Sequence, residues 1–465
     1  MKFFFRKGLV FFSILFLIAF LFSFSFSSSS KKSTKEELSS SEEPLVTNKD
    51  SLISELHRTL DGEFYLFYPL CIDTVYGGYF SDANYKWELS GLQNKMIVTQ
   101  ARHVWSNANA SIFFRTKEPY FKYAEHGFKF LKNIMWDKKY GGFYNLVDRK
   151  GIPIKENGAL IKQAYGDAFA IYGLAAYYKA FGDTSALALA KKTFFWLDKH
   201  SYDPKYGGYF QFMKQDGTPY KNGFMGVPPK DQNSSIHILE CLTELYGVWK
   251  NPLLKERLNS LLLIVRDKMI KDKDYLQLFF NRDLTPVSYR DSSEESRNKN
   301  IELDHISFGH NVETAYLMLE ASNALGIKDN SETIAVGKSM DDFALENGWD
   351  KQHGGIYDGG YLFKGEDSVK IIMNKKEWWS QVEALNSFLL MSRLFPNDKM
   401  NYYEKFLIQW NYIKKYLLDH KYGGFFWDSI DTAPQAEFSP KSSIWKCNYH
   451  TSRALINCIE RLNEK

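Results

Sequence analysis

The sequence predicts an all-α fold, an (α/α)6 barrel in which six helical hairpins close into one ring. The first observation is a repeated motif of two adjacent glycines flanked by aromatic residues, here called the aromatic–Gly–Gly motif. It occurs at residues 76–80, 140–144, 206–210, 354–357 and 422–426. Successive copies are about 64, 66, 147 and 69 residues apart. The long interval covers two periods, so we expect a diverged sixth copy near residues 276–280.

The second observation is helical periodicity between the motifs, for example over residues 168–180, 185–200 and 236–249. Each unit therefore fits two helices plus one motif, in which the glycines supply a left-handed backbone and the aromatics form a short strand or turn. An open helical solenoid is the alternative. Six units with twelve helices and no polar capping repeat favour a closed ring.

The chain divides into three parts. Basic residues followed by an apolar run from about residue 8 to 26 predict a signal peptide or signal anchor over residues 1–27. Residues 28–48 are rich in Ser, Lys and Glu and predict a disordered linker. Residues 49–465 then form one (α/α)6-barrel catalytic domain, placed outside the cytoplasm as a secreted, periplasmic or anchored protein. Residues 291–300 are polar enough to form a loop or flap.

Composition excludes some partners. The formal net charge is +4 and no basic stripe is visible, which argues against nucleic acid. Aromatic residues make up 17% of the chain, a level common where sugars pack on rings and also in large cores. The four cysteines show no metal-binding spacing and cannot be paired from the sequence. We expect a monomer that contacts a membrane only through its N-terminal segment.

Polar groups that could carry chemistry occur where several of the expected inner helices begin. If these helix ends point to one end of the ring, the groups meet in one cavity, and burying so much polarity without function would be costly. The candidates are Arg102, Tyr165, Asn233, His237, His310, Glu313, Trp379, Glu383, Trp445 and His450.

These residue types favour proton transfer. No nucleophile elbow or phosphate-binding glycine loop is present. The histidines come from different repeats, without Cys or an HExxH-like pair, so we expect no metal. Histidines move protons well near neutral pH. Paired carboxylates, Glu313 and Glu383, could instead cleave a glycosidic bond.

Four stretches carry a family resemblance: residues 162–174, 307–313, 377–383 and 445–453. They resemble the cellobiose 2-epimerases, a group within the N-acylglucosamine 2-epimerase family, and the similarity runs from about residue 51 to 463. The resemblance implies a barrel that inverts C2 of the reducing-end glucose in β-1,4-linked disaccharides through a cis-enediolate, without cofactor.

The resemblance also implies a role for each candidate residue. His237 is associated with ring opening, and His310 with His450 serves as the acid/base pair. Arg102 binds the reacting sugar and stabilises the oxyanion. The others hold the sugar, orient histidines or pack on the sugar rings: Tyr165, Asn233, Glu313, Glu383, Trp379 and Trp445. We further expect Glu313 to raise the basicity of His310.

Some features depart from the family pattern. Tyr316 stands where a Trp is usual, Asn448 replaces a Pro, residues 291–300 form a longer insertion, and the export signal is atypical. These departures leave the sugar open among cellobiose, mannobiose, lactose and longer oligosaccharides. Alternatives are a mannobiose or monosaccharide 2-epimerase, an aldose–ketose isomerase, a toroidal glycoside hydrolase or lyase, and a sugar-binding protein without catalysis.

Overall fold

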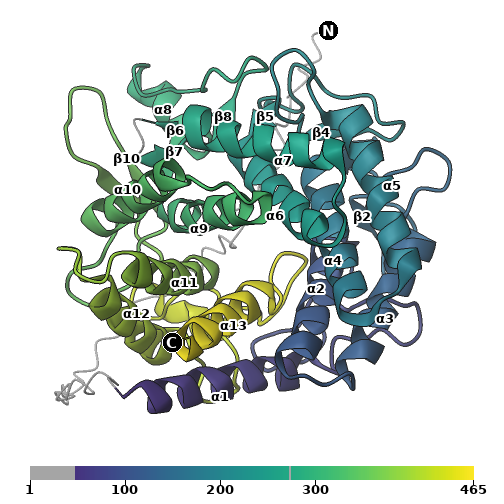
Figure 1. Cartoon of the computed structure of the whole chain (residues 1–465), viewed down its shortest axis with the longest axis horizontal. Helices are drawn as coiled ribbons and strands as arrows, with labels where there is room; N and C mark the ends of the chain where they lie inside the picture. The colour runs from purple at the N-terminus through teal and green to yellow at the C-terminus, as the bar shows by residue number, and fades with distance from the viewer. Residues whose placement is uncertain (1–47, 272–273, 465) are drawn as a thin grey trace, which may run out of the picture.

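Inner and outer helices alternate along the chain of this computed structural model, which describes residues 48–271 and 274–464 (Figure 1). The predicted leader and all but the last residue of the predicted linker lie outside these residues. Among the described helices, none is long and apolar enough to cross a membrane.

Six inner helices form the ring: α2 (Ile97–Phe113), α4 (Ala164–Phe181), α6 (Gln232–Val248), α9 (Phe308–Leu325), α11 (Trp378–Leu394) and α13 (Tyr449–Asn463). Each packs on the next, and α13 packs on α2, which closes the ring. The outer helices are α1 (Lys49–Phe67), α3 (Tyr120–Phe130), α5 (Thr184–Ser201), α7 (Pro252–Ile264), α10 (Ser331–Asn347) and α12 (Tyr402–Tyr416). The predicted (α/α)6 barrel is confirmed, and an open solenoid is excluded.

Burial explains why the inner helices lack a polar face. In α4 every residue from Ala164 to Tyr177 is buried, because the helix packs on two inner neighbours and on outer helices. Gly182 ends α4 in a left-handed conformation, with φ of 74°. Asp183 then begins α5 by accepting hydrogen bonds from the backbone N–H groups of Ser185 and Ala186.

Short antiparallel strands connect the helices. They pair as β1 (Lys95–Met96) with β2 (Leu146–Val147), β3 (Ile161–Gln163) with β4 (Phe212–Lys214), β5 (Lys230–Asp231) with β8 (Phe279–Phe280), β6 (Ile270–Lys271) with β7 (Tyr275–Leu276), and β10 (Gly359–Tyr361) with both β9 (Ile306–Ser307) and β11 (Lys370–Met373). Four of these strands lead directly into an inner helix, namely β1, β3, β5 and β9. The π-helical turns Leu131–Met135 and Val265–Met269 extend α3 and α7, and a 3-10 turn spans Pro434–Phe438.

Each aromatic–Gly–Gly motif forms a tight hairpin after an outer helix. In the second copy, Trp136 bridges Phe143, while Gly141 and Gly142 adopt φ of 72° and 69°. A Cβ at Gly142 would lie 2.9 Å from the Trp196 ring, so only glycine fits this position. The sixth hairpin is the β6–β7 pair, which ends at the start of the region where a diverged copy is predicted.

In five of the hairpins an aspartate forms a buried ion pair with a lysine from a later segment of the chain, which sequence analysis missed. In the second hairpin, Lys162 Nζ lies 3.1 Å from Asp137 Oδ2 and also donates to the Gly141 carbonyl, and both side chains are fully buried. The equivalent pairs are Lys95–Asp73, Lys230–Asp203, Lys376–Asp350 and Lys441–Asp419. In the sixth unit Lys271 and Ile306 occupy the corresponding places, so this unit cannot form the equivalent ion pair.

The polar insertion is partly helical, in contrast to the predicted loop. Helix α8 (Glu294–Asp304) begins at Ser293, whose side chain accepts a hydrogen bond from the Ser296 N–H. None of its residues is buried, so it lacks the apolar periodicity that would have revealed it. All four cysteines are buried and free: Cys71, Cys241, Cys447 and Cys458.

Candidate active site

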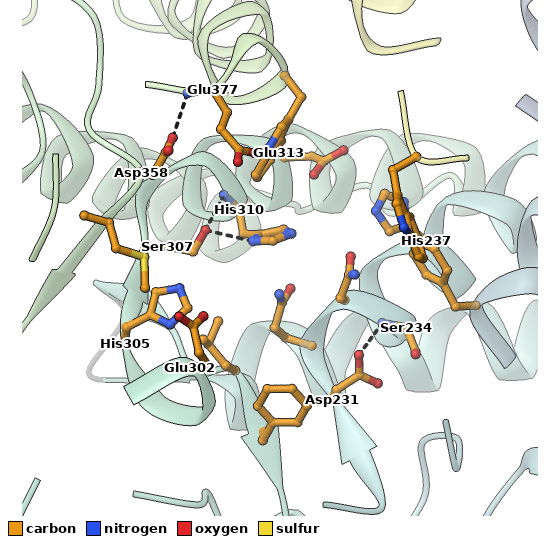
Figure 2. A pocket seen from close by; sticks show the side chains of 18 of the residues that line it. Asp231, Ser234, His237, Glu302, His305, Ser307, His310, Glu313, Asp358 and Glu377 are labelled. Atoms are coloured by element: carbon orange, nitrogen blue, oxygen red, sulfur yellow. Dashed lines mark hydrogen bonds between the residues drawn. The ribbon is translucent and has the colours of Figure 1, made fainter. Parts of the chain in front are cut away.

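One cavity of about 390 Å³ lies at the N-terminal ends of the inner helices. Figure 2 shows His237 and His305 on opposite sides of His310. Nine of the ten predicted site residues line it: Arg102, Tyr165, Asn233, His237, His310, Glu313, Trp379, Trp445 and His450. Helix α8, which continues the insertion, contributes Glu302, and His305 follows α8 directly.

Helix geometry explains this convergence. Arg102, His237 and Glu313 are each the sixth residue of their helix, and Tyr165 and Asn233 are each the second. These positions lie one turn apart, so they share one helix face. The fourth residue instead bonds the adjoining hairpin, as shown by Gln100, Asp167, Asn311 and Gln381. In these four helices, one side of the N-terminal end therefore anchors the fold while the other reaches the cavity.

His450 is oriented by Glu383, the predicted site residue that does not line the cavity. The Nδ1 of His450 lies 2.6 Å from Oε1 of Glu383, so the imidazole donates there and leaves Nε2 available for another contact. The Tyr316 hydroxyl donates to the other oxygen of Glu383, at 2.6 Å. Glu383 therefore orients His450 without lining the cavity. Tyr316 donates a hydrogen bond to Glu383 and does not serve as a stacking surface.

Burial controls the protonation of this pair. Burial lowers the pKa of His450 well below its usual value, and the nearby Arg102 lowers it further. Burial also raises the pKa of Glu383, although Arg453 opposes this shift. Because the two groups share a short hydrogen bond, the pair can hold one proton jointly and present it at the imidazole.

His237 has an equivalent partner in Glu240, which sequence analysis missed. The imidazole Nδ1 donates to Glu240 Oε2 at 2.8 Å. The pKa of Glu240 is lowered despite burial, through the charge of Arg453 and the hydrogen bond from His237. The available signal was spacing, because Glu240 follows His237 by three residues as Glu313 follows His310.

His310 is held by Ser307, not by Glu313. Its Nδ1 lies 2.8 Å from the Ser307 hydroxyl. Burial lowers the pKa of His310 to about 4, and Glu313 only partly opposes this shift. Glu313 thus favours the imidazolium in the expected direction, but the net basicity of His310 falls rather than rises. At neutral pH His310 is uncharged and able to accept a proton.

Trp379 contacts both proton-transfer candidates. Its ring centroid lies 4.8 Å from that of His310 and 5.8 Å from that of His450. Its indole N–H donates to Glu377 at 2.7 Å. A Cβ at Gly309 would lie 2.7 Å from this indole, so the glycine before His310 allows α9 and α11 to approach closely.

Arg102 provides a positive charge at the cavity wall. Its Nη2 donates to the Tyr165 hydroxyl at 2.9 Å, and Nη1 to the Trp445 carbonyl at 3.4 Å. The guanidinium lies 4.3 Å from the Phe169 ring centroid and 4.7 Å from that of Tyr449. A fixed, partly desolvated cation is suited to stabilising an oxyanion.

Glu313, Glu383 and His450 are close enough to hold a metal ion. However, Arg453 Nη2 already occupies the space between the carboxylates, at 2.5 Å from Glu313 and 2.6 Å from Glu383. The guanidinium supplies the positive charge that a cation would bring. The geometry therefore supports an acid/base site with oriented histidines.

Comparison with known proteins agrees with this geometry. The model of the N-acylglucosamine 2-epimerase (GlcNAc 2-epimerase) family matches residues 78–454. The cellobiose 2-epimerases of Dictyoglomus turgidum and Ruminococcus albus are each 28% identical to this chain, covering 88% of it and 99% of their own length. The solved cellobiose 2-epimerase of Spirochaeta thermophila is also 28% identical, with a TM-score of 0.76 over 89% of this chain and 97% of that one.

The chain belongs to the N-acylglucosamine 2-epimerase family. It is a carbohydrate epimerase, an isomerase, and the predicted resemblance to cellobiose 2-epimerases is confirmed. The fold alone would not have shown this. A family 76 glycoside hydrolase of Bacteroides thetaiotaomicron, 12% identical, shares the architecture with a TM-score of 0.59 over 89% of this chain and 78% of its own.

Proposed function

We propose that the chain inverts C2 of the reducing-end glucose in a β-1,4-linked disaccharide, converting cellobiose to glucosyl-mannose. The observation that carries the proposal is the pair His310 and His450, which reach one cavity from different helices and both contact Trp379. The names of the relatives support the same substrate class. The apolar N-terminal run supports placing the activity outside the cytoplasm.

Ring opening comes first, because the closed sugar has no acidic C2 proton. His237, fixed by Glu240, has its Nε2 free to accept the O1 proton. The O1 lone pair forms the carbonyl as the C1–O5 bond breaks, and the proton is returned to O5. The same histidine–glutamate pair thus accepts the proton and returns it, so the step needs no other acid or base.

Epimerisation then follows through a cis-enediolate. One histidine of the pair His310 and His450 removes the C2 proton, and the electron pair moves to O1, beside Arg102. The other histidine enters the step as the imidazolium, delivers its proton to the opposite face of C2 and becomes neutral, while the first histidine keeps the C2 proton and the carbonyl re-forms. One oriented donor to such an oxyanion contributes on the order of 10²–10³ in rate, and each acid/base group about 10²–10⁴.

Proton NMR of residues 45–465 with cellobiose in D₂O tests the proposal. We expect loss of the C2 proton signal together with a mannose-configured reducing end. Ketose formation would make the enzyme an aldose–ketose isomerase, and free glucose would make it a hydrolase. If cellobiose is unchanged, the same assay with mannobiose and with glucose separates the remaining epimerase substrates.

A further inference from the structure

Arg453 connects three buried glutamates that come from three different inner helices. From α13, its Nη1 donates to Glu240 on α6, and its Nη2 donates to Glu313 on α9 at 2.5 Å and to Glu383 on α11 at 2.6 Å. All four side chains are at least 95% buried. A planar guanidinium makes these contacts in a fixed fork, whereas a lysine ammonium is a compact point charge that does not impose this geometry.

Two of these glutamates hold histidines. Glu240 Oε2 accepts from His237, and Glu383 Oε1 accepts from His450. In Glu383 the oxygen that meets His450 is also the one that meets Arg453. One side chain therefore touches the partners of both the ring-opening histidine and a proton-transfer histidine.

The charges in this group nearly balance. With neutral histidines, the guanidinium groups of Arg102 and Arg453 face the three carboxylates that Arg453 contacts, which leaves one negative charge that a single imidazolium would compensate. Buried groups favour such neutrality. Glu320 is not bonded to Arg453, and burial raises its pKa to about 7. The titratable groups facing Arg453 and His450 are Arg102 on α2, Tyr172 on α4, His237 and Glu240 on α6, His310, Glu313, Tyr316 and Glu320 on α9, Glu383 on α11, and Tyr449 on α13.

We propose that Arg453 is a positioning residue that aligns the His237–Glu240 and His450–Glu383 pairs and limits the site to one mobile proton. The inference builds on the proposed function, because that function assigns ring opening and proton transfer to these histidines. It adds that both steps depend on one shared cation. Arg453 itself does not line the cavity.

Two substitutions at Arg453 distinguish the effect of its positive charge from the effect of its planar shape. Arg453→Gln removes the positive charge and leaves the carboxylates uncompensated, so the His450–Glu383 pair holds its proton more tightly. Arg453→Lys retains the charge but loses the planar fork, so the pairs lose alignment while their proton affinity stays near that of the wild type.

Histidine NMR tests the charge effect without substrate. The enzyme is labelled at the histidine Cε1, and His450→Gln assigns the His450 signal. We expect the His450 titration midpoint to rise by about one pH unit in Arg453→Gln, the effect of losing a neighbouring positive charge, and to be unchanged in Arg453→Lys. An unchanged midpoint in a folded Arg453→Gln would overturn the charge role, even if the proposed reaction is correct.

Kinetics test the alignment. In Arg453→Lys we expect kcat for epimerisation to fall about 10²-fold, the cost of misplacing catalytic groups by about 1 Å, with little change in KM. Arg461→Met is the matched control, since Arg461 also links α13 to α11, through Asn386, but touches no histidine. It should keep wild-type kcat. Wild-type kcat in Arg453→Lys would overturn the positioning role. If Arg453→Gln does not fold, the kinetics of Arg453→Lys still test the positioning role.

Discussion

At the scale of single residues, the strongest prediction concerns the two histidines that we propose transfer protons. His310→Ala and His450→Ala should each lower kcat for epimerisation by at least about 10²–10⁴, the usual contribution of an acid or base. Their melting curves should remain cooperative, because both side chains face the cavity. The exposed His420, whose ring contacts the Lys414 carbonyl, provides the control His420→Ala. Wild-type turnover in either cavity variant would contradict the assignment.

The pH dependence follows from the same burial. A histidine with an ordinary pKa of about 6.5 would lose its base form below neutral pH. Burial lowers the pKa of His310 to about 4, so its neutral form persists well into the acid range. We therefore expect kcat/KM to hold to about pH 5 and to fall as pH approaches 4. Circular dichroism at each pH separates unfolding from titration. A midpoint near 6.5 would show that His310 is not the base.

Nine of the ten site residues predicted from the sequence reach the cavity, because helix openings repeat in fixed register. The residues that orient them were harder to find. Glu240 and Arg453 are ordinary charged residues in the sequence, and only the closed ring, which places α6 and α13 across its centre from each other, brings their side chains together. Such a contact joins positions more than 200 residues apart, and no local pattern records it.

At the scale of elements, the hairpins depend on their buried ion pairs. Lys162→Met would leave Asp137 buried without its cation and should cost about 3 kcal/mol, as measured when one partner of a buried pair is removed. Urea unfolding measures this loss. Lys129→Met removes an exposed i,i+4 pair with Glu125 and should leave stability nearly unchanged. Equal effects of the two substitutions would show that burial does not strengthen these pairs.

Acid unfolding should also reveal the contribution of these buried Asp–Lys pairs to stability. Arg149 and Lys95 outweigh burial and lower the pKa of Asp73 to about 2, and the pKa of Asp203 and Asp350 is also about 2. Because the unfolded pKa is about 3.9, this stabilisation is complete above that value and is lost as pH falls toward 2. Tryptophan fluorescence across this range should show Lys162→Met unfolding at higher pH than the wild type.

The elements also show what the sequence could specify. Five glycine pairs revealed the repeat because positive φ leaves a clear residue signature. The Asp–Lys pairs recur with the same period, yet charged residues usually lie on surfaces, so their burial was not predicted. Helix α8 was missed because it has no buried face.

At the scale of the whole molecule, the protein's own cations occupy its acidic clusters. Among the described residues, three groups could hold a metal by geometry: Glu313–Glu383–His450, Asp350–His353–Asp431 and Asp358–Glu377–Asp428. Arg453, Lys376 and Lys375 respectively contact them. We therefore expect epimerisation to be unaffected by EDTA. Activity that is lost in EDTA and restored by a divalent cation would contradict this.

Closure of the ring makes the first helix essential to the last. Helix α1 packs on α13, which carries His450 and Arg453. It buries Leu52, Leu56, Leu60, Phe64 and Phe67. Five such side chains contribute roughly 10 kcal/mol, which is similar to the total stability of a domain. A chain beginning at Pro69 should therefore lose both its cooperative melt and its activity, whereas one beginning at Asn48 should keep both. An active chain without α1 would show that the inner ring closes without its outer partner.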